Sequence, residues 1–236
     1  MSWFRRRVSG PKRIGLALGG GAVRGAAHIG VISVLEREGM RPDFIAGTSA
    51  GALVGAAWAA GLSSAEMHEL MQGLSWGDIT DIAWRKPMSV FNTSPLRKFI
   101  ERAVGGVEFS GLSTPFAAVA CDILSGSRVV ITEGPVAAAA LASAAIPGLF
   151  PPIEHGEMLL VDGGIVDNLP VDVVRKMGAD LVIAVDIILP VGQSHRPTNM
   201  RDMFAATVDV AALSTQSAAL ESADLVIRPE LQGIPA

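Results

Sequence analysis

The sequence predicts an α/β fold in which helices cover both faces of a mostly parallel central sheet, giving three layers. Short β-rich runs alternate with longer segments of helical composition along the chain. Several of these runs are continuously apolar, which is typical of parallel strands buried on both faces. Half of the 236 residues are hydrophobic and 18% are charged, so the chain can bury a large core.

The first part of the chain alternates strand and helix. Residues 13–18 form a short, largely apolar run and are predicted as a strand, and a helix near residues 26–38 follows a glycine cluster. The apolar run at residues 44–46 is predicted as the second strand because a glycine-flanked turn ends it. The Ala-rich residues 50–60 and the polar residues 63–72 are predicted as helices, since alanine is the strongest helix former.

Two helices and a strand pair are predicted in the middle of the chain. The helices lie at residues 95–103 and at the alanine run 137–140. The strands lie at residues 115–121 and 128–131, separated by the turn pair Ser125-Gly126.

The last part of the chain returns to alternation. A short strand at residues 157–161 ends at an aspartate, and a helix at residues 171–177 follows it. Residues 180–186 form a strongly apolar strand, residues 200–222 a long helix, and residues 225–227 a last strand.

The length predicts one domain at residues 13–229, with a basic tail at 1–12 and a short tail at 230–236. The least regular stretches, residues 76–93 and 189–198, are predicted as loops near the mouth of a site.

Composition excludes several classes of function and location. The net charge is −4 and no nucleic-acid-binding motif is present, so no nucleic-acid partner is expected. Glycines or prolines interrupt the uncharged stretches at residues 44–65 and 134–153, which therefore fit buried elements better than membrane spans. The single Cys121 suits a reducing compartment, and no apolar region of a signal peptide follows the basic start. We expect a cytoplasmic protein. The basic tail is interpreted as frayed, with peripheral contact to the inner membrane surface as the alternative.

The most informative motif is Gly47-Thr48-Ser49-Ala50-Gly51. It lies between a predicted strand and a predicted helix, the context in which G-x-S-x-G becomes a nucleophile elbow. Gly47 and Gly51 remove the Cβ atoms that would clash in the tight turn, and Ser49 then lies at a helix N-terminus, which favours developing negative charge. Ser49 is therefore the candidate nucleophile.

A second motif supplies a candidate base. Asp162 follows a predicted strand and precedes Gly163-Gly164, which permit a tight turn and a close backbone approach. The carboxyl ends of strands are where open α/β sheets hold ligands and catalytic groups. A carboxylate held against the serine could act as its base, although Asp-Gly is also an ordinary turn pair.

A third motif supplies candidate oxyanion donors. Gly19, Gly20, Gly21 and Ala22 follow the first strand, and successive glycines let backbone N–H groups converge on an anion. Arg24 either anchors this loop or meets a phosphate-bearing substrate. A dinucleotide-binding loop is disfavoured because the glycine spacing differs from the fingerprint.

A histidine base is the competing interpretation. His155 and His195 follow the serine in the chain, so either could complete a Ser-His-Asp triad, although neither carries a supporting motif. His28 is interpreted as a packing residue and His68 as a solvated one.

Taken together, the glycine cluster with its arginine, Gly-Thr-Ser-Ala-Gly and Asp-Gly-Gly resemble the patatin-like phospholipase family, and the chain looks most like its compact bacterial members. The resemblance covers about residues 13–229 and also rests on residues 27–31, 142–152 and 162–170. It implies a three-layer patatin-like fold with a mostly parallel sheet. It further implies a Ser49–Asp162 dyad without histidine, an oxyanion hole from the amides around Gly20, Gly21 and Ala22, and neither a metal nor an organic cofactor.

The expected function is hydrolysis of carboxylic esters of lipids, phospholipid or lysophospholipid, through an acyl-enzyme. The expected partner is a lipid or acyl-ester substrate, and the sequence carries no indication of an oligomeric state. Two alternatives stay open: a regulatory or lipid-binding module with little catalysis on the same scaffold, and a Ser-His-Asp esterase.

Overall fold

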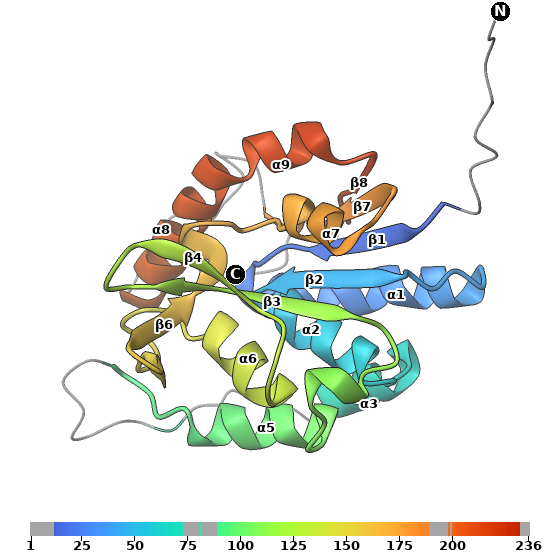
Figure 1. The fold of residues 1–236 in the computed structure, drawn as a ribbon. Helices are drawn as coiled ribbons and strands as arrows, with labels where there is room; N and C mark the ends of the chain where they lie inside the picture. Colours follow the sequence, from blue (N-terminus) through green and yellow to red (C-terminus); the bar gives the residue numbers. More distant parts are fainter. Residues whose placement is uncertain (1–11, 73–80, 82–88, 189–197, 199, 232–236) are drawn as a thin grey trace, which may run out of the picture.

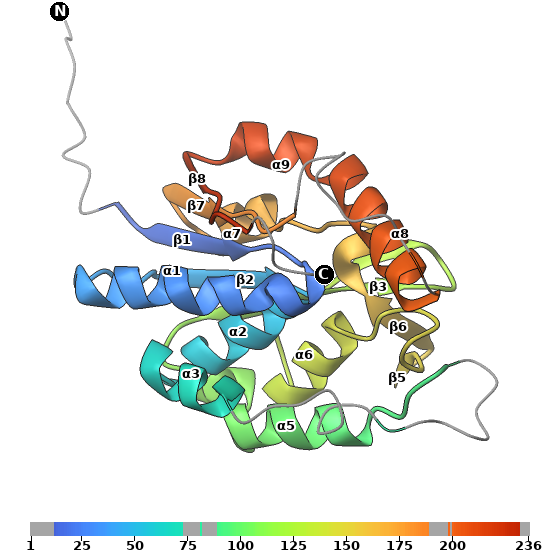
Figure 2. The same ribbon diagram turned by 180° about the vertical axis from the view of Figure 1, so that it is seen from behind.

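A computed structural model of the chain describes residues 12–72, 81, 89–188, 198 and 200–231. A central sheet is covered by helices on both faces, which confirms the predicted α/β class and its three layers (Figures 1 and 2). The predicted tails at 1–12 and 230–236 and the predicted loops at 76–93 and 189–198 fall mostly outside the described residues.

The strands form one sheet. Their bounds are β1 Ile14–Leu18, β2 Phe44–Thr48, β3 Phe116–Asp122, β4 Ser127–Ile131, β5 Ile153–His155, β6 Met158–Asp162, β7 Leu181–Val185 and β8 Leu225–Ile227.

The longer helices are α1 Ala26–Arg37, α2 Ala50–Ala59, α3 Ser64–Gln72, α5 Ser94–Val104, α6 Val136–Ser143, α7 Val171–Met177, α8 Met200–Thr215 and α9 Ser217–Ser222. The described residues also form short 3₁₀ turns between strands and helices: η1 Ala22–Gly25, η2 Phe109–Gly111 and η3 Gly163–Ile165.

The core has two halves, one on each face of the sheet. Side chains of α1, α2, α5 and α6 pack with one set of strand residues, among them Leu16, Ile45 and Phe116. Side chains of α7 and α9 pack on the opposite face, against residues that include Ala46 and Val119. The alternation of side chains along the central strands therefore sends successive buried residues to opposite halves of the core.

The larger part of the sheet is parallel, as predicted, and an antiparallel part at one end makes the whole sheet mixed. The order β3-β2-β1-β7-β8 is parallel throughout, whereas β4 and β6 are antiparallel to β3 and β5 is antiparallel to β6. Short connections explain the antiparallel pairs β3–β4 and β5–β6, because a parallel pair needs a crossover of a dozen residues or more. The prediction included the β3–β4 pair but lacked β5.

Strand β3 brings two other strands end to end. Its residues 116–119 pair with β2, and its residues 120–122 pair with β6. Strand β4 pairs over residues 118–122 and so occupies the other edge of β3. The last residues of β2 and β6, Thr48 and Asp162, therefore lie opposite the consecutive residues Val119 and Ala120.

The long predicted helix at residues 200–222 is divided at Gln216 into α8 and α9. The Gln216 side chain is buried, and its Oε1 accepts a hydrogen bond from Asn168 Nδ2. No proline or glycine marks this break in the sequence. Within the described part of the chain, no helix combines the length and apolar character needed to cross a membrane.

Candidate active site

Ser49 occupies a strained turn between β2 and α2. Its backbone has φ 54° and ψ −122°, and Ala22 is the other non-glycine residue with positive φ among the described residues. The turn is possible because Gly47 and Gly51 pack backbone against backbone: a Cβ on Gly51 would overlap the carbonyl oxygen of Leu18. Such strain, of about 1–3 kcal/mol, is typical of functional sites.

The Ser49 hydroxyl donates a hydrogen bond to Asp162, with 2.5 Å between Oγ and Oδ2. Asp162 Oδ1 accepts a second hydrogen bond, from the N–H of Gly164 at 2.8 Å. Burial raises the pKa of Asp162 to about 6, and the two hydrogen bonds oppose this shift. A carboxylate with a raised pKa next to a hydroxyl is equipped to take its proton.

The glycine loop lies beside the serine. A Cβ on Gly20 would lie 3.1 Å from Cβ of Ser49. The N–H groups of Gly19 and Gly20 already donate to the carbonyl oxygens of Val185 and Asn168, at 3.1 and 3.2 Å. Among the described residues, no hydrogen-bond acceptor is found for the N–H groups of Gly21 and Ala22. Of the four candidate oxyanion donors, Gly21 and Ala22 are therefore the two whose N–H groups are not used within the described part of the chain.

Two buried side chains hold the glycine loop. Arg24 is 1% exposed, and its Nε donates to the carbonyl oxygen of Gly21 at 3.3 Å, which supports the loop-anchor interpretation over contact with a substrate phosphate. His28 is fully buried on α1, and burial lowers its pKa to about 4. The neutral ring therefore donates from Nε2 to the carbonyl oxygen of Gly19 at 2.8 Å.

Ser143, the last residue of α6, fixes the backbone of Ser49. Its hydroxyl oxygen accepts a hydrogen bond from the N–H of Ser49 at 2.9 Å and donates one to the carbonyl oxygen of Val119 at 2.5 Å. Sequence reasoning gave Ser143 no role of its own. The signal available was its place in the stretch at residues 142–152 that supports the family resemblance.

An apolar cavity of about 280 Å³ opens at Ser49. Apart from the serine, its lining consists of apolar residues and glycine from η1, α1, α2, α3, α5 and the segment after α6. Lining residues include Ile29, Leu53, Val54, Met67, Leu96 and Phe99. Ser49, the candidate nucleophile, therefore faces a space suited to a hydrocarbon chain.

The described histidines do not contact the candidate dyad. His28 bonds to Gly19, exposed His68 bonds to Gln72, and exposed His155 lies on β5 without a hydrogen bond to Ser49 or Asp162. His195 lies outside the described residues. In the described part of the chain, no group of three His, Cys, Asp or Glu side chains is placed to hold a metal ion.

The chain matches known proteins over most of its length. The family model described as patatin-like phospholipase matches residues 16–175. An uncharacterised NTE family protein of Mycobacterium tuberculosis (strain ATCC 25618 / H37Rv) is 39% identical over 188 residues, which cover 78% of this chain and 51% of that protein. The patatin-like phospholipase domain-containing protein 6 of Mus musculus is 33% identical over 77% of this chain and 14% of its own length. The chain thus spans about half the length of the mycobacterial relative and a small part of the mouse one.

A solved structure supports the fold alone. The crystal structure of VipD from Legionella pneumophila has a TM-score of 0.58 and 16% sequence identity, over 91% of this chain and 56% of that chain.

Proposed function

The chain belongs to the patatin-like phospholipase family, and from this premise we propose that it is a serine acyl hydrolase that cleaves carboxylic esters of lipids with a Ser49–Asp162 dyad. The observation that carries the proposal is the hydrogen bond of 2.5 Å from Ser49 Oγ to a carboxylate that is 1% exposed. The absence of any described histidine from this pair favours the dyad over a histidine-based triad.

The first half-reaction forms an acyl-enzyme. Ser49 Oγ attacks the ester carbonyl carbon while its proton moves to Asp162 Oδ2, and the carbonyl oxygen becomes an oxyanion. The N–H groups of Gly21 and Ala22 are the donors available to stabilise it, and one such donor is typically worth about 3 kcal/mol of the barrier. The tetrahedral intermediate collapses, the alcohol leaves, and it takes its proton from Asp162.

The second half-reaction releases the acyl group. Asp162, ionised again, accepts a proton from a water molecule as that water attacks the acyl carbonyl carbon. Collapse of this second intermediate breaks the bond to Ser49 Oγ, which regains a proton from Asp162. The carboxylic acid leaves and the enzyme returns to its starting state.

The cavity supports a lipid acyl chain as the group next to the scissile carbonyl. Its apolar wall begins at the nucleophile, and burial of each methylene group contributes about 0.8 kcal/mol. We further propose that the protein acts in the cytoplasm on lipids at the inner membrane surface, since its single cysteine suits a reducing compartment.

Hydrolysis of a p-nitrophenyl ester and of a lysophospholipid by the purified chain tests this function. Wild type is expected to turn over both and to label with a fluorophosphonate probe, whereas Ser49→Ala should do neither and Asp162→Asn should lose turnover. Activity retained in Ser49→Ala would end the proposal. Failure of the wild type to label or hydrolyse, with vesicle binding intact, would favour the non-catalytic lipid-binding alternative.

A further inference from the structure

Asp167 contacts the neighbour of each member of the candidate dyad. It lies between η3 and α7, and its carbonyl oxygen accepts a hydrogen bond from Thr48 Oγ1 at 2.9 Å. Its backbone N–H donates to the carbonyl oxygen of Gly163 at 2.9 Å. Thr48 directly precedes Ser49, and Gly163 directly follows Asp162. The backbone of Asp167 thus holds both the residue that precedes Ser49 and the residue that follows Asp162.

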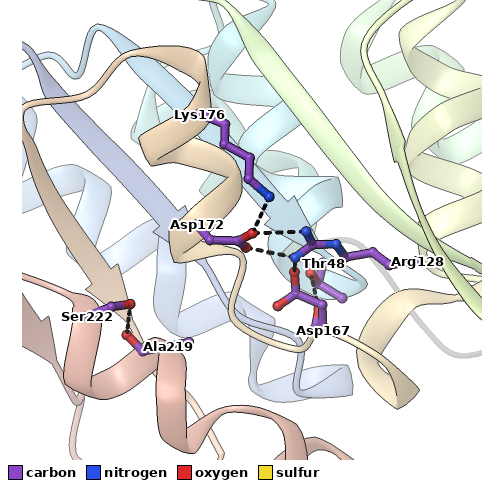
Figure 3. Close-up of polar contacts among 7 residues, drawn as sticks. All are labelled: Thr48, Arg128, Asp167, Asp172, Lys176, Ala219 and Ser222. Carbon is purple, nitrogen blue, oxygen red and sulfur yellow. Dashed lines mark hydrogen bonds and ion pairs between the residues drawn. The ribbon is translucent and has the colours of Figure 1, made fainter.

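The carboxylate of Asp167 is in turn held by Arg128. Asp167 is 8% exposed, and its Oδ2 lies 2.5 Å from Nη1 of Arg128 on strand β4. The same guanidinium makes two further hydrogen bonds, of 2.7 and 2.9 Å, with both carboxylate oxygens of Asp172 at the start of α7. Figure 3 shows the Arg128 guanidinium between Asp172 and Asp167, and Thr48 beside Asp167.

The charge pair belongs to the face of the sheet away from the substrate cavity. Arg128 pairs with Cys121 on β3 and bonds to α7 and the loop before it, whereas the cavity lies among α1, α2, α3 and α5. Neither Arg128 nor Asp167 lines the cavity. A change in the pair can therefore act on the geometry of the dyad without touching the bound acyl chain.

We infer that Arg128 and Asp167 form a positioning pair, which holds Ser49 and Asp162 in reacting geometry through Thr48 and Gly163; this rests on the proposed hydrolase function. A buried carboxylate needs a partner charge, because a lone one is strongly disfavoured. Without Arg128 the loop around Asp167 must move toward water to solvate that charge, and both backbone hydrogen bonds move with it. Displacements of about 1 Å in a reacting pair can cost roughly a hundredfold in rate.

Steady-state kinetics of Asp167→Asn, Arg128→Gln and the double variant test the inference, with rates expressed per active site titrated by the fluorophosphonate. The titration counts only folded, reactive molecules. Asp224→Asn is the matched control, because Asp224 forms an ion pair of the same length, 2.5 Å, with Arg175 on α7 and contacts neither Thr48 nor Gly163. Circular dichroism gives Tm for each variant.

For each single variant we expect kcat to fall roughly ten- to a hundredfold with KM within about twofold of wild type. The double variant should lose no more than the worse single variant, since the two residues act as one unit. Asp224→Asn should keep the wild-type kcat even where its Tm falls. If Asp167→Asn fails to fold, the kcat of Arg128→Gln per titrated active site tests the inference by itself.

Three results would overturn the inference: kcat per active site equal to that of Asp224→Asn, a loss confined to KM, or additive losses in the double variant. A failure of the proposed function is distinguishable, because it shows as activity that survives Ser49→Ala or as wild type without turnover.

Discussion

The hydroxyl of Ser143 lies 2.9 Å from the backbone nitrogen of Ser49 and accepts its hydrogen bond. This hydrogen bond connects the strained turn at Ser49 to the end of α6. The Ser143 hydroxyl also donates to the carbonyl oxygen of Val119, which connects the same turn to strand β3. The N–H of Ser49 is thereby used within the protein and does not join Gly21 and Ala22 as a candidate oxyanion donor.

Ser143→Ala is expected to lower both stability and kcat. It leaves a buried N–H and a buried carbonyl without their partner, which costs about 1–3 kcal/mol of unfolding free energy. Urea denaturation and ester hydrolysis check this. Ser113→Ala is the control, because Ser113 also donates to a backbone carbonyl, that of Ala59 at the far end of α2. An equal loss of kcat in both variants would contradict a local role of Ser143.

The pH dependence of kcat/KM should report the ionisation of Asp162. The base must be ionised to take the serine proton, and burial raises its pKa to about 6. Activity on a neutral ester should therefore rise with pH and reach half its maximum near pH 6. A midpoint near the ordinary value of 3.8 would contradict a buried base. A midpoint that shifts in His155→Ala or His195→Ala would support the triad instead.

Asp162 should also make the fold less stable as pH rises. Below its ordinary pKa of 3.8 the carboxyl is protonated in both states, but between 3.8 and about 6 the folded chain binds the proton more tightly than the unfolded chain. Its contribution to stability is thus complete below 3.8 and lost through about pH 6. Relative to the non-titrating Asp162→Asn, wild type should lose about 3 kcal/mol across this window. Urea titrations of both at several pH values measure the difference, and a constant difference would refute the buried charge.

His28 should tolerate glutamine better than asparagine. The amide nitrogen of glutamine can take the place of Nε2, which donates to the carbonyl oxygen of Gly19, whereas asparagine reaches only the place of Nδ1. We expect kcat of His28→Gln to exceed that of His28→Asn roughly tenfold, a barrier difference of about 1.4 kcal/mol. Equal kcat values per titrated active site would show that the hydrogen bond does not hold the glycine loop in its active position.

Val54→Trp should shift the preference toward short acyl chains. Val54 is half-buried on α2 and lines the cavity, so the larger ring has space to enter it. Loss of room for two methylene groups, at about 0.8 kcal/mol each, lowers kcat/KM on a dodecanoyl ester roughly tenfold and leaves a butanoyl ester unchanged. The exposed Val34 on α1 provides the control Val34→Trp. A uniform loss on both esters would argue against an acyl pocket here.

Most of the fold was predictable because local patterns dominate it. Continuous apolar runs marked β1, β2, β3 and β7, and helix composition marked α1 and α2 within a residue or two of their observed ends. Strand β5 was missed because it is only three residues long and mostly exposed, so it carries no apolar run. The parallel part of the sheet was predictable, whereas the antiparallel position of β6 beside β3 depends on tertiary pairing, which periodicity does not report.

The site was predictable where a motif carries a chemical group and unpredictable where a contact depends on tertiary structure. Ser49 and Asp162 stand in motifs, and the structure brings them together across 113 positions. The N–H groups of Gly19 and Gly20 donate to the carbonyl oxygens of Val185 and Asn168, which lie far along the chain. The sequence therefore does not show that these two donors are already in use. Arg128 belongs to no motif, and its ion pair with Asp167 depends on the folded structure, which brings β4 close to the start of α7.

The shared edge of β3 has a consequence for synthesis of the protein. Residues 116–119 of β3 pair with β2, and residues 120–122 pair with β6. Ser49 therefore gains its carboxylate partner, Asp162, only when β6 has paired with β3. A chain emerging from the ribosome exposes Ser49 long before residue 162 exists. The nascent protein therefore holds Ser49 without its carboxylate partner, and the proposed hydrolase acquires its dyad late in folding rather than with the first folded half.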